Sequence, residues 1–423
     1  MNATEQRPIE LRFWHHTAIF AVACVLLITR RPDAIFHAQF WAEDGHAWFA
    51  DAYNFGWWTA MFRTQDGYFQ TLPRFAASLA LLAPLSLAPL VLNLIAIAVR
   101  ALPANLLLSP RSSAWGSLRY RTLLAGVYLV LPNTREMDAI VTSSQWVLSL
   151  SAFLLLVASA PKGFAGRLFS IAFLILCGLT GPFCVFLLPV ALFLAWRRRD
   201  SWRRLQAGVL VMCCLVQAWG LLIVNPSGRS HYAAVGASPA LFARLLAGQV
   251  YLGTLLGSNG LDAIPGRRIL IFFIFVAIAG TAIIAVCFVK SAIEMKLLLA
   301  FSAFLLAASL ISPNCGSPNG VSAWEMLTGG GGIRYWFFPT LAFAWSLLWC
   351  FRSRLLLLRI VSAPLLLLMC FGIVRDWKHP AFPDLHFAED AKRIESAPVG
   401  MAVTIPENPQ GWTIRLVKRP PAQ

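Results

Sequence analysis

The sequence predicts an all-α polytopic membrane protein with about eleven transmembrane helices. Of its 423 residues, 58% are hydrophobic and only 13% are charged. This composition and the positive mean hydropathy of +0.67 exclude an ordinary soluble domain. Apolar segments of about 15 to 25 residues recur along the chain, and such segments can cross a hydrocarbon core that is about 30 Å thick.

The expected spans are separated by connections of unequal length. They cover residues 13–29, 76–99, 119–132, 145–160, 168–180, 182–196, 205–224, 269–289, 297–312, 335–351 and 355–373. Lys and Arg gather in alternate connections, which we therefore place in the cytoplasm together with Arg100. Arg30 and Arg31 fall on the opposite side, against this trend. The formal charge of +16 then reflects topology, and no nucleic-acid partner is implied.

This topology puts the N-terminus in the cytoplasm and the C-terminus outside. Three segments, 30–75, 225–268 and 313–334, become extracytoplasmic loops of a membrane domain that covers residues 1–373. The tail, 374–423, reads as a small α+β appendage. Phe387, Ala391 and Ile394 fit one face of a short helix, and Trp412, Ile414 and Leu416 alternate as in a strand.

The best candidates for catalysis are the adjacent acids Glu43 and Asp44, directly after the first span. A carboxylate within hydrogen-bond reach of an acceptor can serve as a general base. Gly45 permits a sharp turn that would direct one acid into a cavity. Adjacent acids also often cap the helix that follows, so the capping interpretation stays open.

Four arginines are candidates for binding the phosphate of a lipid-linked donor. Arg334 follows four glycines, whose backbone N–H groups can surround an anion. Arg74, Arg63 and Arg135 are further outer cations. The alternative is that Arg334 is an interfacial anchor after a flexible loop.

Polar and aromatic residues near the outer helix ends could line a substrate cavity. The set contains Trp41, His46, Tyr68, Gln70, Asp138, Gln145 and Tyr335. Ordinary hydrated turns have a similar composition. No HExxH, Walker A, GxSxG or zinc-type motif occurs, so we expect no required cofactor and no metal site, and the sequence offers no support for a divalent metal.

The chain resembles the GT-C class of integral-membrane glycosyltransferases of bacterial surface-glycan biosynthesis. The resemblance rests on Trp41–Gly45 after the first span, Gly67-Tyr68 through Pro73-Arg74, and Gly332–Tyr335 before a late span. It implies a polyprenyl-phosphate sugar donor, a glycan or lipid-linked acceptor, and inverting displacement on the extracytoplasmic side of the inner membrane. It further implies that Asp44 or Glu43 is the base, with Arg334, then Arg74, on the donor phosphate and Asp138 as the second acid.

Two other classes share many of these features. An O-antigen polymerase or ligase has many spans and lipid-linked substrates, but depends more on outer-loop arginines. A transporter or flippase of lipid-linked glycans should carry ionisable groups deep inside several spans, whereas most charges here lie at predicted span ends.

Overall fold

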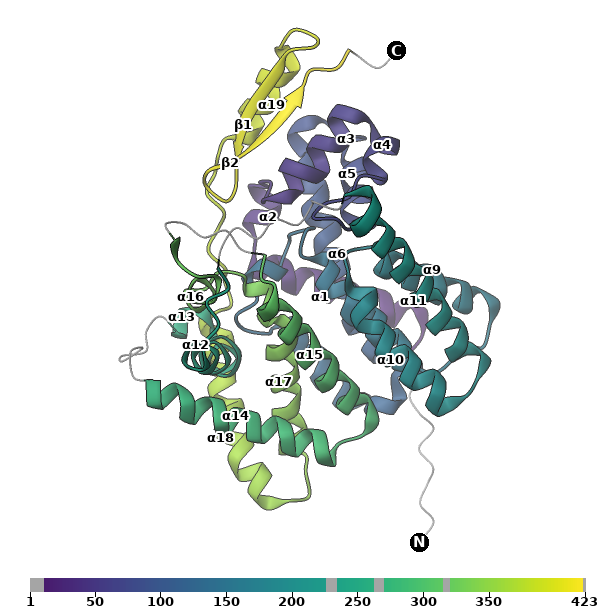
Figure 1. The fold of residues 1–423 in the computed structure, drawn as a ribbon, viewed down its shortest axis with the longest axis vertical. Coiled ribbons are helices and arrows are strands. Elements are labelled where there is room, and N and C mark those ends of the chain that lie inside the picture. The colour runs from purple at the N-terminus through teal and green to yellow at the C-terminus, as the bar shows by residue number, and fades with distance from the viewer. Residues whose placement is uncertain (1–10, 226–233, 262–269, 315–319, 421–423) are drawn as a thin grey trace.

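The structure is a computed structural model that describes residues 11–225, 234–261, 270–314 and 320–420. It is mostly helical, as expected for an all-α membrane protein (Figure 1). Seven helical segments are long and apolar enough to cross a membrane. They are Phe13–Arg30, Leu85–Leu108, Ser201–Val224, Pro239–Leu261, Leu270–Lys290, Ile293–Ile311 and Leu356–Arg375.

A described helix overlaps each region where the sequence predicts a span. These helices are α1 (Phe13–Arg30), α6 (Ala88–Leu108), α7 (Leu118–Leu129), α8 (Ser144–Val157), α9 (Phe164–Gly178), α10 (Phe183–Arg198), α11 (Ser201–Trp219), α14 (Leu270–Lys290), α15 (Ile293–Ile311), α17 (Phe337–Phe351) and α18 (Leu356–Arg375). Five of them, α7 to α10 and α17, have only 12 to 16 residues. A full crossing needs about 20 residues, so the count of eleven crossings stays a prediction.

Helices α8 and α17 form the centre of the bundle. Almost all of their side chains are buried, because they are apolar on every face and have other helices around them. Phe153 of α8 stacks on Phe301 of α15, and Phe301 meets Phe338 of α17 edge to face. By contrast, α14 and α18 leave most of their apolar surface exposed, as lipid-facing helices do.

The span expected at 76–99 is divided in two. Helix α5 (Thr71–Ala80) ends before Pro84, and α6 begins only at Ala88. Pro84 cannot donate the backbone hydrogen bond that a continuous helix would need. Helix α6 therefore extends to Leu108, and Arg100, expected in a cytoplasmic loop, lies inside α6 with 1% exposure. That expectation was wrong.

The expected loop 225–268 contains an additional apolar helix. It consists of α12 (Pro239–Arg244), a π-helical part (Leu245–Leu252) and α13 (Gly253–Leu261). Before it, Val235 O accepts a hydrogen bond from Trp324 N, and at its far end Ser258 N donates to Asp376 beyond α18. In Figure 1, α12 is seen end-on, across the direction of α17 and α18.

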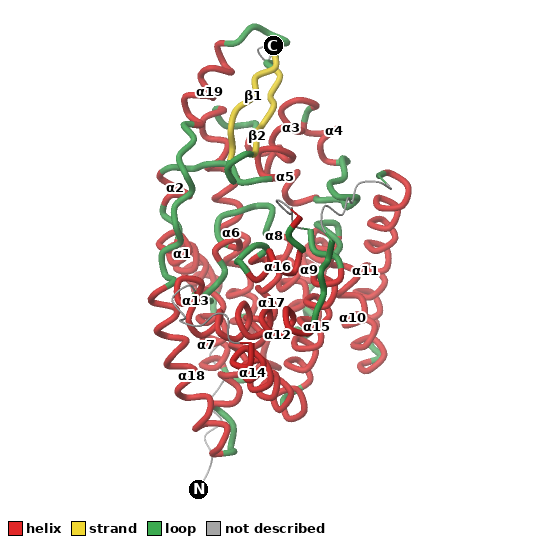
Figure 2. Tube along the Cα trace, turned by 60° about the vertical axis from the view of Figure 1, so that its left-hand side comes forward, coloured by secondary structure: helices red, strands yellow, loops and turns green. Residues whose placement is uncertain are grey.

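Short helices of the first loop and the C-terminal unit gather at one end of the bundle, which we call the tail end (Figure 2). The first loop contains α2 (Asp33–Phe36), a π-helix (Asp44–Phe49), α3 (Ala50–Phe55), α4 (Trp57–Met61) and α5. Helix α16 (Ala323–Thr328) is capped by Ser322. The Ser322 hydroxyl accepts a hydrogen bond from Glu325 N.

The C-terminal unit has the predicted α+β structure. Helix α19 (Phe387–Ser396) buries Phe387, Ala391 and Ile394, as the sequence indicates. Strands β1 (Ala402–Glu407) and β2 (Trp412–Val417) pair antiparallel, with Ile405 opposite Ile414. The unit is more than an appendage, because Phe387 also packs edge to face on Phe40 of the first loop, and the two share one apolar core.

A buried carboxylate, Asp138, connects helices α1 and α6 of the bundle to the C-terminal segment. Its Oδ2 lies 3.3 Å from Arg30 Nη1 of α1 and 2.8 Å from His379 Nε2, and its Oδ1 lies 3.1 Å from Arg100 Nε of α6. Burial alone would raise the pKa of Asp138, but the two guanidiniums hold it well below its usual range. Burial lowers the pKa of His379. Asp138 is therefore an ionised structural group at neutral pH.

We expect Asp138→Asn to destabilise the protein strongly. Removing one partner of a buried ion pair leaves uncompensated charge, which costs about 3–5 kcal/mol. The thermal unfolding midpoint of the purified protein in detergent should fall. The control is Asp200→Asn, since Asp200 is an exposed helix cap and asparagine caps a helix equally well. Equal midpoints for both variants would contradict this role.

Candidate functional site

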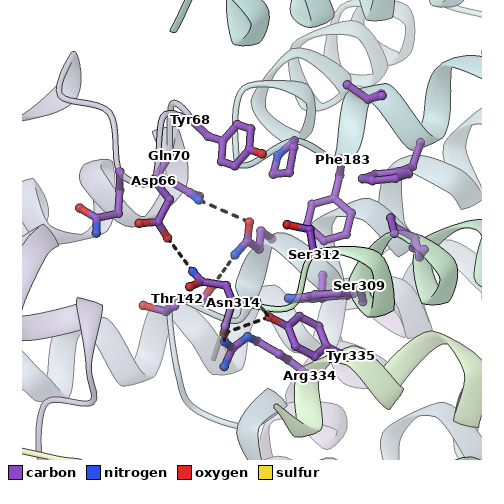
Figure 3. A pocket seen from close by; sticks show the side chains of 18 of the residues that line it. Asp66, Tyr68, Gln70, Thr142, Phe183, Ser309, Ser312, Asn314, Arg334 and Tyr335 are labelled. Atoms are coloured by element: carbon purple, nitrogen blue, oxygen red, sulfur yellow. Dashed lines mark hydrogen bonds between the residues drawn. The ribbon is translucent and has the colours of Figure 1, made fainter. Parts of the chain in front are cut away.

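A cavity of about 490 Å³, which we call the main cavity because several elements build its walls, lies at the tail end of the bundle. The first loop, the start of α8, α10, α15 and the segment before α17 contribute its walls (Figure 3). These elements are far apart in the sequence. A cavity built by so many elements, at the end of a helical bundle, is the strongest candidate for a substrate site.

One end of this cavity is polar. Asn314 donates from Nδ2 to Asp66 Oδ2 at 2.9 Å, and its backbone oxygen accepts from Arg334 Nη2 at 2.9 Å and from the Tyr335 hydroxyl at 3.1 Å (Figure 3). Gln70 Nε2 lies 3.4 Å from Gln145 Oε1. Amides, hydroxyls and carboxylates surrounded by aromatic rings suit a polyhydroxylated ligand.

The other end of the cavity is apolar. Its lining residues come from α10, from the π-helical segment Gly220–Val224 after α11, and from α15, namely Phe183, Val185, Phe186, Leu221, Leu305, Ala308 and Ile311. Ile311 and Val185 are 74% and 47% exposed, so this wall continues onto the outer face of the bundle. A ligand with a polar head and a hydrocarbon chain could therefore occupy both ends.

The two adjacent acids have different positions. Glu43 is half-buried and lines the cavity, whereas Asp44 is 2% exposed and does not. Asp44 accepts hydrogen bonds from Val141 N at 3.0 Å, Thr142 N at 2.8 Å and Thr142 Oγ1 at 2.6 Å. Burial raises the pKa of Asp44 to about 7, and these hydrogen bonds oppose the rise. Asp44 fastens the first loop to the segment before α8, while Glu43 is presented to ligands.

Arg334 lies at the polar end, in a single 3-10 turn, Ile333–Trp336. The turn follows Gly332, whose φ of +62° favours glycine. Glu136 Oε2 accepts from Arg334 N at 3.2 Å and lies 3.5 Å from its Nη1. The side chain is 31% exposed, so a ligand in the cavity can reach part of the guanidinium.

Two N–H groups of the glycine loop before Arg334 are used within the chain. Gly329 N and Gly331 N both donate to Met326 O, closing the C-terminus of α16. Backbone N–H groups that terminate a helix in this way are not available to a phosphate. The positive charge at this wall of the cavity comes from the Arg334 side chain.

Six of the predicted site residues line the cavity. They are Glu43, Tyr68, Gln70, Gln145, Arg334 and Tyr335. Sequence reasoning did not single out Trp48, Gln65, Thr142, Ser309 and Asn314, which also line it. Asn314 stands in a polar loop that is rich in proline and glycine, and Thr142 stands just before a polar helix start. These two compositions are what in the sequence could have indicated the two residues.

Seven predicted site residues lie outside the cavity lining. Besides Asp44 and Asp138, they are Arg74, Arg63, Arg135, Trp41 and His46. Arg74 is completely buried and pairs with Asp51 at 2.6 Å, and Arg63 pairs with the same oxygen at 3.0 Å. Asp51 of α3 thus holds α3 against α5 through Arg74.

The remaining three have structural contacts. The carbonyl oxygen of Arg135 accepts a hydrogen bond from Arg31 Nη2 at 3.2 Å. Trp41 stacks on Phe382 with ring centroids 4.5 Å apart. His46 Nδ1 lies 3.0 Å from Thr413 O of the C-terminal unit.

A second hollow of about 650 Å³ lies on the other side of the extended segment 68–71. Its lining is almost entirely apolar and includes Trp57, Trp58, Phe62, Phe75 and Trp219. Trp57, Trp58 and Phe62 are more than half exposed. Aromatic side chains of this kind favour the headgroup level of a bilayer, which agrees with an interfacial position for α4.

The described residues contain no group of three His, Cys, Asp or Glu side chains that could hold a metal ion. The chemistry that the cavity offers comes from two carboxylates, Glu43 and Asp66, one guanidinium and several hydrogen-bonding groups. Such a set can accept a proton, neutralise an anion and orient hydroxyls.

No protein-family model matches the chain. A comparison with curated proteins likewise finds no relative. Any functional assignment therefore depends on the site itself.

We expect Thr142→Val to loosen the acidic turn. The hydroxyl donates to Asp44 and accepts from Trp48 Nε1 at 2.9 Å. Its removal leaves Trp48 Nε1 without this partner and takes one of three hydrogen bonds from Asp44. This should cost about 1–3 kcal/mol and lower the thermal unfolding midpoint. Thr122→Val is the matched control, because the Thr122 hydroxyl is exposed and bonds only within its own helix. Equal midpoints would show that Asp44 is held by the backbone alone.

Proposed function

We propose that this protein is an integral-membrane glycosyltransferase. It transfers a sugar from a polyprenyl-phosphate donor to a surface glycan or lipid-linked acceptor, by inverting displacement on the extracytoplasmic side of the inner membrane. The observation that carries the proposal is the main cavity. Glu43 and Arg334 both line it, and its apolar wall reaches the outer face of the bundle.

The apolar wall supports a lipid-linked donor. A polyprenyl chain could lie along α10 and α15, where Val185 and Ile311 are exposed to the surroundings of the bundle. The phosphate and sugar would then enter the polar end together. Binding both parts in one cavity would align the sugar without a dedicated soluble-donor site.

The reaction follows from the positions of the two charged groups. Glu43 accepts the proton of the acceptor hydroxyl, whose oxygen forms a bond to the anomeric carbon of the donor sugar. The bond between that carbon and the phosphate oxygen breaks, and polyprenyl phosphate leaves with the electron pair. Arg334 stabilises the negative charge on the leaving phosphate. The balance needs no cofactor.

Charge distribution supports the proposed topology. Basic residues concentrate in connections at the bundle end opposite the tail end, among them Arg111, Arg119, Lys162, Arg167, Arg197, Arg198, Arg199, Arg204, Lys290, Lys296, Arg352, Arg354 and Arg359. Cytoplasmic loops carry such an excess. Eleven crossings then place the N-terminus inside and the tail outside. This proposed count leaves out 239–261, which is also long and apolar enough to cross.

The test is to incubate the purified protein with a panel of polyprenyl-phosphate sugars and surface-glycan or lipid-linked acceptors. The proposal predicts acceptor-dependent release of polyprenyl phosphate and inversion at the anomeric carbon. Release from no donor in the panel would contradict it and would favour a transporter of lipid-linked glycans.

We expect Glu43→Gln to reduce transfer by about 10²–10⁴-fold, because the amide cannot accept the acceptor proton. The donor KM should change little, since the shape and hydrogen bonding of the side chain are kept. Glu389→Gln, on the exposed side of α19, is the matched control and should retain full activity. Activity within twofold of wild type would exclude Glu43 as the base.

We expect Arg334→Ala to weaken donor use, with the donor KM raised about tenfold or more, because the phosphate loses a charge-assisted partner. Arg63→Ala is the control, since Arg63 pairs with Asp51 and does not line the cavity. Equal donor KM values for the two variants would contradict a phosphate-binding role for Arg334 and would favour its alternative role as an interfacial anchor.

A further inference from the structure

The C-terminal unit contacts the acidic turn of the first loop through its backbone. Asn408 O accepts a hydrogen bond from Ala42 N at 2.5 Å, and residues 41 and 408 form a backbone bridge. Glu407 Oε2 accepts from His46 N at 3.1 Å. The C-terminal unit therefore holds the turn on both sides of Glu43 and Asp44.

The turn itself is in a conformation that needs such support. Ala42 has φ of +49°, a region that costs a residue with a side chain about 1 kcal/mol or more. At Gly45, an added Cβ would lie 2.3 Å from Glu407 Oε2 and 2.4 Å from Ile414 Cδ1, so only glycine allows this close approach. Backbone hydrogen bonds within the turn, from Asp44 N to Trp41 O and from Gly45 N to Ala42 O, help to hold the bend, and the C-terminal unit packs against it from outside.

Glu43 is thus placed between two fastened neighbours. Ala42 is fastened to Asn408 of the C-terminal unit, and Asp44 is fastened to Val141 and Thr142 before α8. Between these two attachments the side chain of Glu43 lines the main cavity together with Arg334.

We propose that the C-terminal unit is a positioning element of the catalytic site, with Glu407 as the residue that clamps the Glu43 turn in a pH-dependent way. The catalytic consequence rests on the proposed function. The clamp itself does not, because it concerns contacts between two parts of the folded chain.

The charge environment of Glu407 makes the clamp sensitive to pH. Glu407 is 3% exposed, its Oε1 has no hydrogen-bond partner among the described residues, and it forms no ion pair there. The groups that face it are the carboxyls of Asp44 and Glu43 and the backbone N–H of His46. Burial is the larger cause and the charge of Asp44 the second cause that raise the pKa of Glu407 to about 9. At neutral pH the carboxyl is protonated and does not repel Asp44.

The sign of the pH effect follows from this raised pKa. The folded state keeps the Glu407 proton up to about pH 9, whereas the unfolded chain loses it near the ordinary value of 4.5. The folded state therefore binds more protons between these values, and the stabilisation present at low pH is lost as the pH rises toward 9. Above that pH the ionised carboxyl repels Asp44 across the interface, and the clamp should open.

Hydrogen exchange of the full-length protein in detergent, followed by mass spectrometry of peptides covering residues 40–49, tests the clamp. Glu407→Ala removes one of the two acceptors of His46 N, the other being Ala42 O at 3.2 Å, together with the contact between β1 and the turn. We expect exchange in these peptides to rise about tenfold at pH 7. Glu407→Gln keeps an acceptor without a charge, and should match wild type at pH 7. Glu395→Ala, an exposed change on α19, is the control.

The pH arm separates a clamp from a simple packing contact. After correction for intrinsic exchange rates, wild type should lose protection in 40–49 progressively between pH 7 and pH 9, about the pKa of Glu407, and then level off, while Glu407→Gln should not. Identical pH responses of wild type and Glu407→Gln, or no effect of Glu407→Ala, would overturn the proposal.

In a transfer assay, Glu407→Ala should lower kcat about tenfold with an unchanged donor KM, and Glu407→Gln should restore it. If wild type transfers no sugar, the proposed function fails while the exchange result still decides on the clamp. If transfer is active and Glu407→Ala leaves both exchange and kcat unchanged, the clamp fails and the glycosyltransferase proposal stands.

Discussion

The ion cluster around Asp138 is the interaction on which the rest of the tail end depends. The Asp138 carboxylate pairs with three side chains: Arg30 at the end of α1, Arg100 inside α6 and His379 at the start of the C-terminal segment. Buried charge at this depth is tolerated only when it is paired. Pairing therefore fixes the segment before α8, and this segment in turn supplies the N–H groups that hold Asp44.

The site is consequently assembled from long-range attachments and does not belong to any single element. Glu43 comes from the first loop, Gln145 from α8, Phe183 from α10 and Arg334 from the turn before α17. Buried acids anchor the walls, whereas Glu43 and Asp66 are half-buried and line the cavity. This division explains how two adjacent carboxylates can have different roles: Asp44 satisfies buried backbone donors, whereas Glu43 keeps its oxygens for a ligand.

Features with a local cause could be predicted from the sequence. The helical spacing of Phe387, Ala391 and Ile394 gave α19, and the alternation around Ile414 and Leu416 gave β2, because each pattern places a face against the same core. Arg334 and Tyr68 reached the cavity as expected. Pairings between distant segments could not be predicted: nothing in the sequence shows that Asp51 neutralises Arg74 or that Asp138 neutralises Arg100. The direction of each acid in a tight turn likewise depends on contacts from β1 and from residues 141–142.

The central claim is that the main cavity binds a polyprenyl-phosphate sugar with its chain along α10 and α15. Photocrosslinking of the purified protein with a donor analogue that carries a photoreactive group in the prenyl chain tests it most directly. The account predicts labelled peptides from residues 183–186 and 305–312, with labelling suppressed by unmodified donor. Labelling confined to other helices, or unaffected by competing donor, would contradict it.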